Sequence, residues 1–445
     1  MTFSHLPALL SAWLNQIVAA LDRRSAPRLL RLFLGALFAR GRRTVTSWFR
    51  AAGITDDFRR GYCALWASGR HAYALAYRLL GIALKALMSS VPDNHLLFAI
   101  DDTPTARYGP HVQAAGIHHN PSPGPAGEKF VYGHLWVTLS WLVRHRLWDT
   151  LSLPLRALLY VRATDVPKLT KFYPWEFRTK LELAVELARW LVQWLGHSGK
   201  ALWLAADGAY AKRPFLRPVL ALGLVLFSRL RKDADLRSLP PTRRRGQRGR
   251  PPLYGKDKID LAKRAGQKRG WQRLECVQYG HRRIKTIKTF LATWRPVGGP
   301  VRVVIVRETD GWLAYFCTDV NMPAATILEV MADRGAIEQM FKDVKEVWGA
   351  GQQQVRNVYA NIGAFAVNLV LYSVVEAWAW ERGEEELVDR RRSPWDWEYR
   401  RPSHADKRKA LQREILRSEI QAAVGERTQA REFRDLAARL LDWAA

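Results

Sequence analysis

The amino-acid sequence predicts an α/β protein with a mixed sheet and a helical region at each end. Two short apolar runs, 96–100 and 201–206, each stop at an aspartate and a turn signal, as buried strands do. Two further strand candidates, 135–143 and 148–153, and a strongly helical stretch, 176–195, lie between them. Strands followed by alternating helices and strands are typical of an α/β domain with a mixed sheet.

The charge balance points to a polyanionic partner. The 445 residues include 70 Lys and Arg against 41 Asp and Glu, which gives a net charge of +29. These charges repel one another in the folded chain, and a bound polyanion relieves the repulsion. Nucleic acid is the first candidate and an anionic membrane surface is the second. The three cysteines lie far apart, which excludes a disulfide framework and a Cys-rich zinc site and fits a reducing cytoplasm.

The first ninety residues are expected to form a helical, basic DNA-binding region. Thr44 can cap a helix that Gly53 ends, and Asp56 and Asp57 can begin the next helix. Two short helices with a tight glycine turn and arginine-rich flanks suit a helix-turn-helix-like DNA reader. An ordinary helical bundle with a solvated basic face explains the same pattern, so both interpretations stay open.

Residues 229–322 are expected to form a basic, β-rich insertion. Eleven Lys or Arg and three Asp fall between positions 229 and 258. Apolar runs at 301–307 and 312–317, on either side of an Asp-Gly dipeptide, predict a hairpin. Arg248 and Arg250 belong to an Arg-Gly-Arg-Pro segment that resembles an AT-hook core, which lies in a narrow minor groove. A solvated loop that becomes ordered on phosphate is the alternative interpretation.

Three carboxylates could form a site for phosphodiester chemistry. Asp102 and Asp207 each follow a buried strand, and Glu338 lies on a later helix. Two metal ions can activate an attacking oxygen and stabilise a leaving one, and hard cations such as Mg²⁺ take carboxylate oxygens as ligands. Asp101 precedes Asp102, and successive strand residues face opposite sides, so one of the two points into such a site. Periodicity alone leaves the choice open.

The helix that carries Glu338 also carries two cations on the same face. At about 100° per residue, Arg334 and Lys345 fall on the stripe that contains Glu338. In a DNA-cleaving enzyme the two cations would hold DNA phosphates while Glu338 binds metal. An i,i+4 ion pair between Arg334 and Glu338 on a solvated face is the structural alternative.

The segment 334–345 resembles the signature Y-x2-R-x3-E-x6-K of bacterial insertion-sequence transposases, which have a site of two Asp and one Glu. Arg334, Glu338 and Lys345 occupy matching positions, and Met331 stands where the signature has Tyr. The segments 100–103 and 206–208 resemble the two aspartate motifs of the same family. The resemblance covers about residues 96–380.

This resemblance implies an RNase H-like catalytic core, two Mg²⁺ or Mn²⁺ ions and cut-and-paste transfer of DNA. It implies that Asp102, the aspartate directly before a Thr, binds metal together with Asp207 and Glu338. It also implies that Arg334 and Lys345 position the strand end and that the insertion contacts DNA. The expected partners are the element ends and target DNA, bound by a homodimer in the bacterial cytoplasm at the nucleoid, with no membrane association.

Two other functions stay open. One is an RNase H-like nuclease that cleaves DNA without strand transfer, and the other is a transposase-derived DNA-binding protein that has lost catalysis. In each case the expected organisation is the same. It consists of a helical basic region (1–90), the first part of the core (91–228), the insertion (229–322), the core helices with Glu338 (323–385) and a basic helical tail (386–445).

Overall fold

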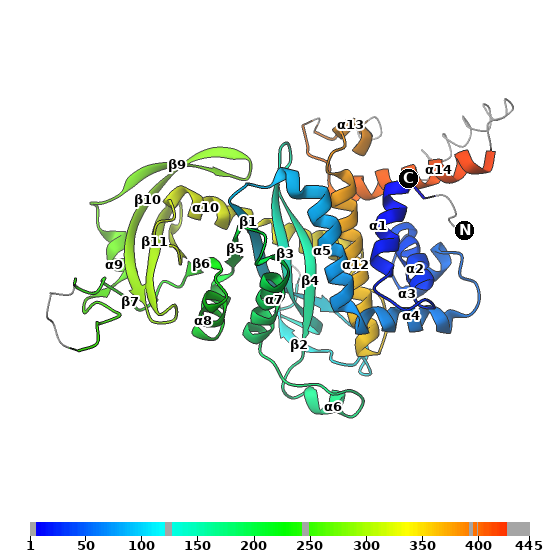
Figure 1. Ribbon diagram of the computed structural model, residues 1–445, viewed down its shortest axis with the longest axis horizontal. Helices are drawn as coiled ribbons and strands as arrows, with labels where there is room; N and C mark the ends of the chain where they lie inside the picture. The colour runs from blue at the N-terminus through cyan, green and yellow to red at the C-terminus, as the bar shows by residue number, and fades with distance from the viewer. Residues whose placement is uncertain (1–5, 121–126, 243–248, 391–394, 398, 425–445) are drawn as a thin grey trace.

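A single mixed sheet runs through the protein and organises it (Figure 1). The computed structural model describes residues 6–120, 127–242, 249–390, 395–397 and 399–424. Within these residues the sheet has twelve strands. They are β1 (His95–Ala106), β2 (Gly116–His119), β3 (Phe130–His145), β4 (Asp149–Tyr160), β5 (Ala201–Ala206), β6 (Val225–Leu230), β7 (Leu236–Arg237), β8 (Lys258–Ile259), β9 (Gln272–Gln278), β10 (His281–Trp294), β11 (Gly299–Glu308) and β12 (Gly311–Cys317).

Helices pack on both faces of the sheet, and the helices of the N-terminal region form part of a helical block at one side of it (Figure 1). They are α1 (Ala8–Val18), α2 (Ala26–Phe38), α3 (Val45–Ala51), α4 (Phe58–Arg70), α5 (Ala72–Leu87), α6 (Val166–Thr170), α7 (Lys180–Leu195), α8 (Arg213–Ala221), α9 (Leu261–Gly266), α10 (Ala324–Asp333), α11 (Ala336–Glu346), α12 (Val358–Ala379), α13 (Glu384–Leu387) and α14 (His404–Val424). Short 3₁₀ turns, η1 (Met88–Ser90) and η2 (Gly208–Tyr210), follow α5 and β5.

The strand order places the core and the insertion in one sheet. The order is β2-β3-β1-β5-β6-β12-β11-β10-β7-β8, with β4 also paired to β3 and β9 to β10. β1 runs antiparallel to β3 and parallel to β5, and β5 runs parallel to β6. The fold is therefore mixed α/β, as predicted, and is compatible with the RNase H-like core that the resemblance implies. The strands after β6 extend the same sheet, because β12 pairs with β6.

Two apolar cores lie on the two faces of this sheet. We call the face covered by α10, α11 and α12 the α12 face, and the face covered by α7 and α8 the α7 face. Along β1, Leu97 and Ala99 belong to the core on the α12 face, whereas Phe98 and Ile100 belong to the core on the α7 face. Both faces of β1 are therefore buried, and its side chains alternate between the two cores.

The N-terminal helices confirm part of the predicted local structure. Thr44 caps α3 by accepting a hydrogen bond from the backbone N–H of Ser47, and Gly53, with φ of +68°, follows the end of that helix. Asp57 precedes α4 with φ of +47° and makes no side-chain cap. The helix therefore begins directly after the aspartates, as predicted, but without a hydrogen bond to a capping side chain.

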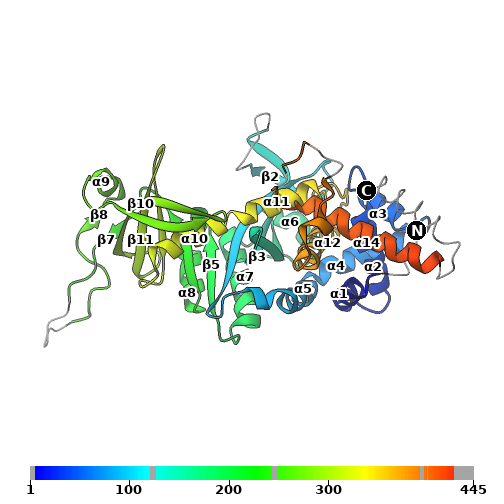
Figure 2. The same cartoon turned by 90° about the horizontal axis from the view of Figure 1, so that it is seen from above.

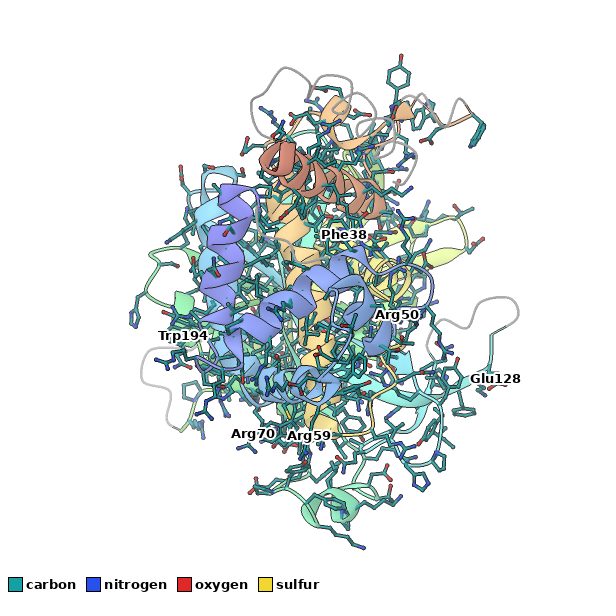
Figure 3. The ribbon with its side chains drawn as sticks, turned by 90° about the vertical axis from the view of Figure 1, so that its right-hand side faces the viewer. Phe38, Arg50, Arg59, Arg70, Glu128 and Trp194 are labelled. Atoms are coloured by element: carbon teal, nitrogen blue, oxygen red, sulfur yellow. The ribbon has the colours of Figure 1, made fainter. Side chains whose placement is uncertain are left out.

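Helix α4 is a core helix that keeps one face exposed. A Cβ on Gly69 would lie 1.8 Å from the carbonyl oxygen of Tyr359 in α12, and a Cβ on Gly363 would lie 2.0 Å from that of Leu65. Glycine is required at both positions because the two backbones touch. This packing agrees with the helical-bundle interpretation. Figure 3 labels Arg59 and Arg70, near the two ends of α4, on the helical face of the molecule.

Helix α12 lies at the centre of the helical block. It is long and apolar enough to cross a membrane by length and composition, as is the segment Ala72–Ser90, but most of α12 is buried inside the protein. Helix α14 crosses it and reaches the N-terminal helices (Figure 2), and Phe38, the last residue of α2, lies beside α14 (Figure 3).

Buried ionic contacts fasten α14 to this block. The carboxylate of Glu376 in α12 accepts hydrogen bonds from His404 Nδ1 and Lys407 Nζ, each at 2.6 Å, and all three side chains are almost fully buried. The guanidinium of Arg408 donates to the carbonyl oxygens of Leu37 and Ala39. A buried charge is tolerated when it is paired and hydrogen-bonded in this way.

We expect Lys407→Met to lower the free energy of unfolding by about 3 kcal/mol, because it leaves the buried carboxylate of Glu376 with one partner fewer. Chemical denaturation measures this change. Arg282→Met is the matched control, since its ion pair with Glu275 is exposed, and it should leave stability unchanged. Adding Glu376→Gln to Lys407→Met should restore part of the loss, and a Lys407→Met protein as stable as the parent would contradict the argument.

Candidate active site

Asp101 and Asp207 occupy equivalent positions where β5 ends: Asp101 lies within β1, which continues to Ala106, and Asp207 directly follows β5. In the parallel pairing of β1 with β5, Ala99 lies beside Ala205 and Ile100 beside Ala206. Ala99 and Ala205 both belong to the core on the α12 face. Because side chains alternate along a strand, Asp101 and Asp207, each two positions further on, point toward that same face.

Arg334 joins this strand end to Glu338. It follows the last residue of α10, and its Nη1 lies 2.8 Å from Asp101 Oδ2 while its Nη2 lies 2.8 Å from Glu338 Oε1. Burial lowers the pKa of Arg334, but Asp101, Glu338 and Asp207 together outweigh burial and raise it. One guanidinium therefore contacts two carboxylates, Asp101 and Glu338, and the negative charge of Asp207 acts on it as well.

Asp102 lies on the opposite, α7 face of β1. Its Oδ2 accepts a hydrogen bond from Lys180 Nζ at 2.9 Å, and its Oδ1 accepts one from the hydroxyl of Tyr210 at 2.8 Å. Lys180 begins α7, and Tyr210 ends the 3₁₀ turn that follows Asp207. Of the predicted set, Asp207 and Glu338 thus share one face with Asp101, the aspartate that the family motif did not favour. Asp102 does not share this face.

The environment of Tyr210 keeps its hydroxyl protonated. Burial raises its pKa well above the ordinary value, and the negative charges of Asp102, Asp101 and Asp207 raise it further. Tyr210 therefore donates to Asp102 at neutral pH. This hydrogen bond and the one from Lys180 hold Asp102 in a fixed orientation on its side of the strand.

The carboxyl group of Asp101 has a raised pKa. Burial raises its pKa to about 7, although the nearby Arg334 lowers it, and Asp102 and Asp207 add smaller increases. Removing a carboxylate from water disfavours its charged form, and here this effect exceeds the attraction of one guanidinium.

The carboxylates of the site suit a hard divalent cation, but two of them, Asp101 and Glu338, are bound to Arg334. Carboxylate oxygens are the ligands that Mg²⁺ prefers. Among the residues that the structure describes, no group of three or more His, Cys, Asp or Glu side chains is close enough to hold a metal ion. Metal binding therefore requires Arg334 to release Asp101 and Glu338. Glu338 can move, because its side chain is 64% exposed.

The other predicted DNA-binding residues lie in different surroundings. Lys345 is half-buried on α11, and burial lowers its pKa. In the described part of the chain no hydrogen bond or ion pair engages its ammonium group, so Lys345 is available to bind an anion. Arg250 is exposed in the loop between β7 and β8, and Arg248 lies outside the described residues. Met331, at the position of the signature Tyr, packs against the core on the α12 face.

Tyr279 is a neighbour of the site that sequence reasoning missed. It forms the tip of the β9–β10 hairpin and has φ of +53°, and a Cβ placed on Gly335, next to Arg334, would lie 3.6 Å from its ring. The hairpin rests on α10, because the Val277 N–H donates to Glu329 at 2.9 Å. The available signal was the dipeptide Tyr279-Gly280 between two strands, but a bulky residue rarely adopts positive φ, so the pattern does not predict a tight turn there.

Comparison with known families identifies the family to which the chain belongs. Residues 16–295 match the family model described as "DDE superfamily endonuclease". The matched stretch is more than half of the 445-residue chain and contains β1 and β5 with their aspartates. No curated protein matches the chain significantly.

We expect Asp101→Asn to change how stability depends on pH. The pKa of Asp101 is about 7 in the folded protein against 3.8 ordinarily, so the folded state holds a proton that the unfolded chain releases. The stability from this proton is complete below about pH 4 and is lost as pH rises to about 7. In the presence of a chelator, the free energy of unfolding of the parent should fall over this range relative to that of Asp101→Asn. A constant difference between the two proteins would contradict the raised pKa.

Proposed function

We propose, on the premise that the chain belongs to the DDE superfamily of endonucleases, that it is the transposase of a bacterial insertion sequence of the Y-R-E-K signature group. In this role it cleaves DNA at the element ends and joins the released 3′ ends to target DNA. The observation that carries the proposal is that Arg334 joins Asp101 to Glu338 through two contacts of 2.8 Å, with the charge of Asp207 also acting on it. The net charge of +29 fits a DNA substrate.

Asp101, Asp207 and Glu338 are the proposed metal ligands. This set replaces Asp102 with its neighbour, and the reason is the direction of the side chains along β1. Asp102 instead acts as a positioning residue, because Lys180 and Tyr210 hold it against the α7 face, where it fixes the start of α7 and the turn after Asp207.

Divalent ions, when bound, supply the activated oxygen nucleophile and stabilise charge on the transferring phosphate. The protein's own residues bind and orient the strand. Arg334 presents a planar fork that suits a phosphate as well as a carboxylate, so an arriving DNA phosphate can replace Asp101 and Glu338 as its partner. Lys345, about two turns after Glu338 on α11, is available to hold a second phosphate.

This exchange links DNA binding to the opening of the carboxylate site. Without DNA, Arg334 neutralises two carboxylates that would otherwise repel each other. With DNA, the guanidinium turns to phosphate and leaves carboxylate oxygens for metal. The proposed partners are therefore the element ends and target DNA, with two protomers joining two ends, in the bacterial cytoplasm at the nucleoid.

Substitution of each proposed ligand in turn tests the assignment of the metal ligands. Asp101→Asn, Asp207→Asn and Glu338→Gln should each lower Mg²⁺-dependent nicking of plasmid DNA carrying the element ends by at least roughly 100-fold, because each removes a charged oxygen ligand. Binding of the same DNA, measured by gel shift, should persist. Asp102→Asn is the matched control, and its loss should be about 10-fold or less. If Asp102→Asn abolishes nicking while Asp101→Asn retains it, the ligand set is the one that the family motif favoured.

A strand-transfer assay separates the transposase from the nuclease that cleaves without joining. Labelled duplexes ending in a 3′-hydroxyl at the element end should become covalently joined to target plasmid in the presence of Mg²⁺ or Mn²⁺. Glu338→Gln should abolish joining and nicking together, because both steps use the same ligands. Cleavage without joining would support the nuclease. DNA binding with neither reaction in either metal would support the non-catalytic protein.

A further inference from the structure

A cationic cavity opens at the C-terminal end of β1, beyond the aspartates. It has a volume of about 190 Å³ and lies between the loop after β1 and the loop before α12. Arg107, His111 and Arg356 line it, together with Tyr108 and Gln354. None of its lining residues is an aspartate or glutamate.

Arg107 is buried in the wall of this cavity without a counter-charge. Its side chain belongs to a residue that is 4% exposed. Its Nε donates a hydrogen bond to His134 Nδ1 at 3.0 Å, while its Nη1 is buried and has no hydrogen-bond partner among the described residues. In that part of the chain no carboxylate forms an ion pair with it, and burial alone lowers its pKa, to about 10.

His134 does not supply the missing charge. Its Nδ1 accepts from Arg107 and its Nε2 lies 2.9 Å from the carbonyl oxygen of Gln113, so the ring is neutral with the proton on Nε2. Burial, with a smaller contribution from Arg107, lowers the pKa of His134 to about 3. At neutral pH the pair therefore carries the single positive charge of Arg107. His134 is fully buried and contacts Arg107 through this hydrogen bond.

The rim of the cavity carries further positive charge, and two backbone segments approach each other closely in its wall. Arg356 and His111 are exposed at the rim, and the guanidinium of Arg42 lies 5.9 Å from the ring centre of Tyr108. Gly351 has φ of +102°, and a Cβ there would lie 3.0 Å from the carbonyl oxygen of Ala106. The loop before α12 can therefore approach the end of β1 closely enough to close one wall.

We infer that this cavity binds a phosphate group, with Arg107 as its buried counter-charge and Arg356 at its rim. A buried charge without a partner is unfavourable in the isolated protein, and an anion from outside removes the penalty. A guanidinium with a free N–H edge matches the oxygens of phosphate. The phosphate can belong to a DNA backbone or be free in solution.

The DNA source rests on the proposed function and sets a distance. Arg107 is six positions beyond Asp101 along an extended segment, which corresponds to about 20 Å at 3.3 Å per residue. At 3.4 Å per base pair, a duplex held in both places would span no more than about six base pairs between them. Arg107 would then bind a DNA phosphate near the phosphodiester bond that reacts, without contacting that bond.

The test compares Arg107→Met with the parent in two arms. In the first arm, inorganic phosphate without DNA or metal should raise the unfolding temperature of the parent but not of Arg107→Met. In the second arm, binding of a short element-end duplex is measured against salt concentration, and the slope of log Kobs against log salt should become shallower by about 0.9 in Arg107→Met. Arg189→Met, at an exposed arginine of α7, is the matched control and should behave as the parent does in the phosphate arm.

Two readouts separate binding from a structural role. In phosphate-free buffer Arg107→Met should be at least as stable as the parent, because it removes an uncompensated charge; a large loss of stability would indicate that the contact with His134 matters instead. Arg356→Met, on the exposed rim, should weaken the phosphate response while leaving the fold intact.

Each pattern of results has one meaning. A response in both arms, or in the duplex arm alone, supports a DNA phosphate, and a response in the phosphate arm alone supports free phosphate. If neither Arg107→Met nor Arg356→Met changes either arm, the inference is overturned. Neither arm requires cleavage, so this result is independent of whether Glu338→Gln abolishes nicking.

Discussion

The register of β1 on β5 is the constraint on which the candidate site depends. Because Ile100 lies beside Ala206 in a parallel pair, the residue that follows each of them is an aspartate, and the two aspartates lie at the same level of the sheet and point to the same face. Arg334 then connects β1 to α11 through contacts of 2.8 Å with Asp101 and Glu338. A shift of one residue in this pairing would send one aspartate to the other side of the sheet and leave Arg334 with a different set of partners.

Two adjacent residues of β1, Asp101 and Asp102, face opposite sides of the sheet and have different charged partners. Asp101 faces α11 and is paired with a guanidinium that phosphate can also bind. Asp102 faces α7 and is held by an ammonium group and a phenol. The first arrangement is half open, because Glu338 is exposed, and the second is closed by α7 and the turn after β5. A single strand thus carries one carboxylate that can change partners and one that keeps the surrounding elements in place.

The sequence predicted elements better than directions. The apolar run 201–206 coincides with β5, the hairpin around Gly311 joins β11 to β12, and Thr44 caps α3. The choice between Asp101 and Asp102 was beyond prediction because both faces of β1 are apolar, so no polar face reveals the phase of the alternation. The cavity at Arg107 was equally hidden, since its two walls are separated by more than two hundred positions and meet through packing alone.

Helix α14 has a consequence for the order in which the chain acquires its structure. The carbonyl groups at the end of α2 receive their hydrogen bonds from Arg408, which is 371 positions away from Leu37. During synthesis the N-terminal helices therefore emerge from the ribosome long before the residue that completes them. The helical block around α12 closes after α14 has been translated, so a nascent chain shorter than this has unfinished helix ends and an uncovered apolar surface on α12.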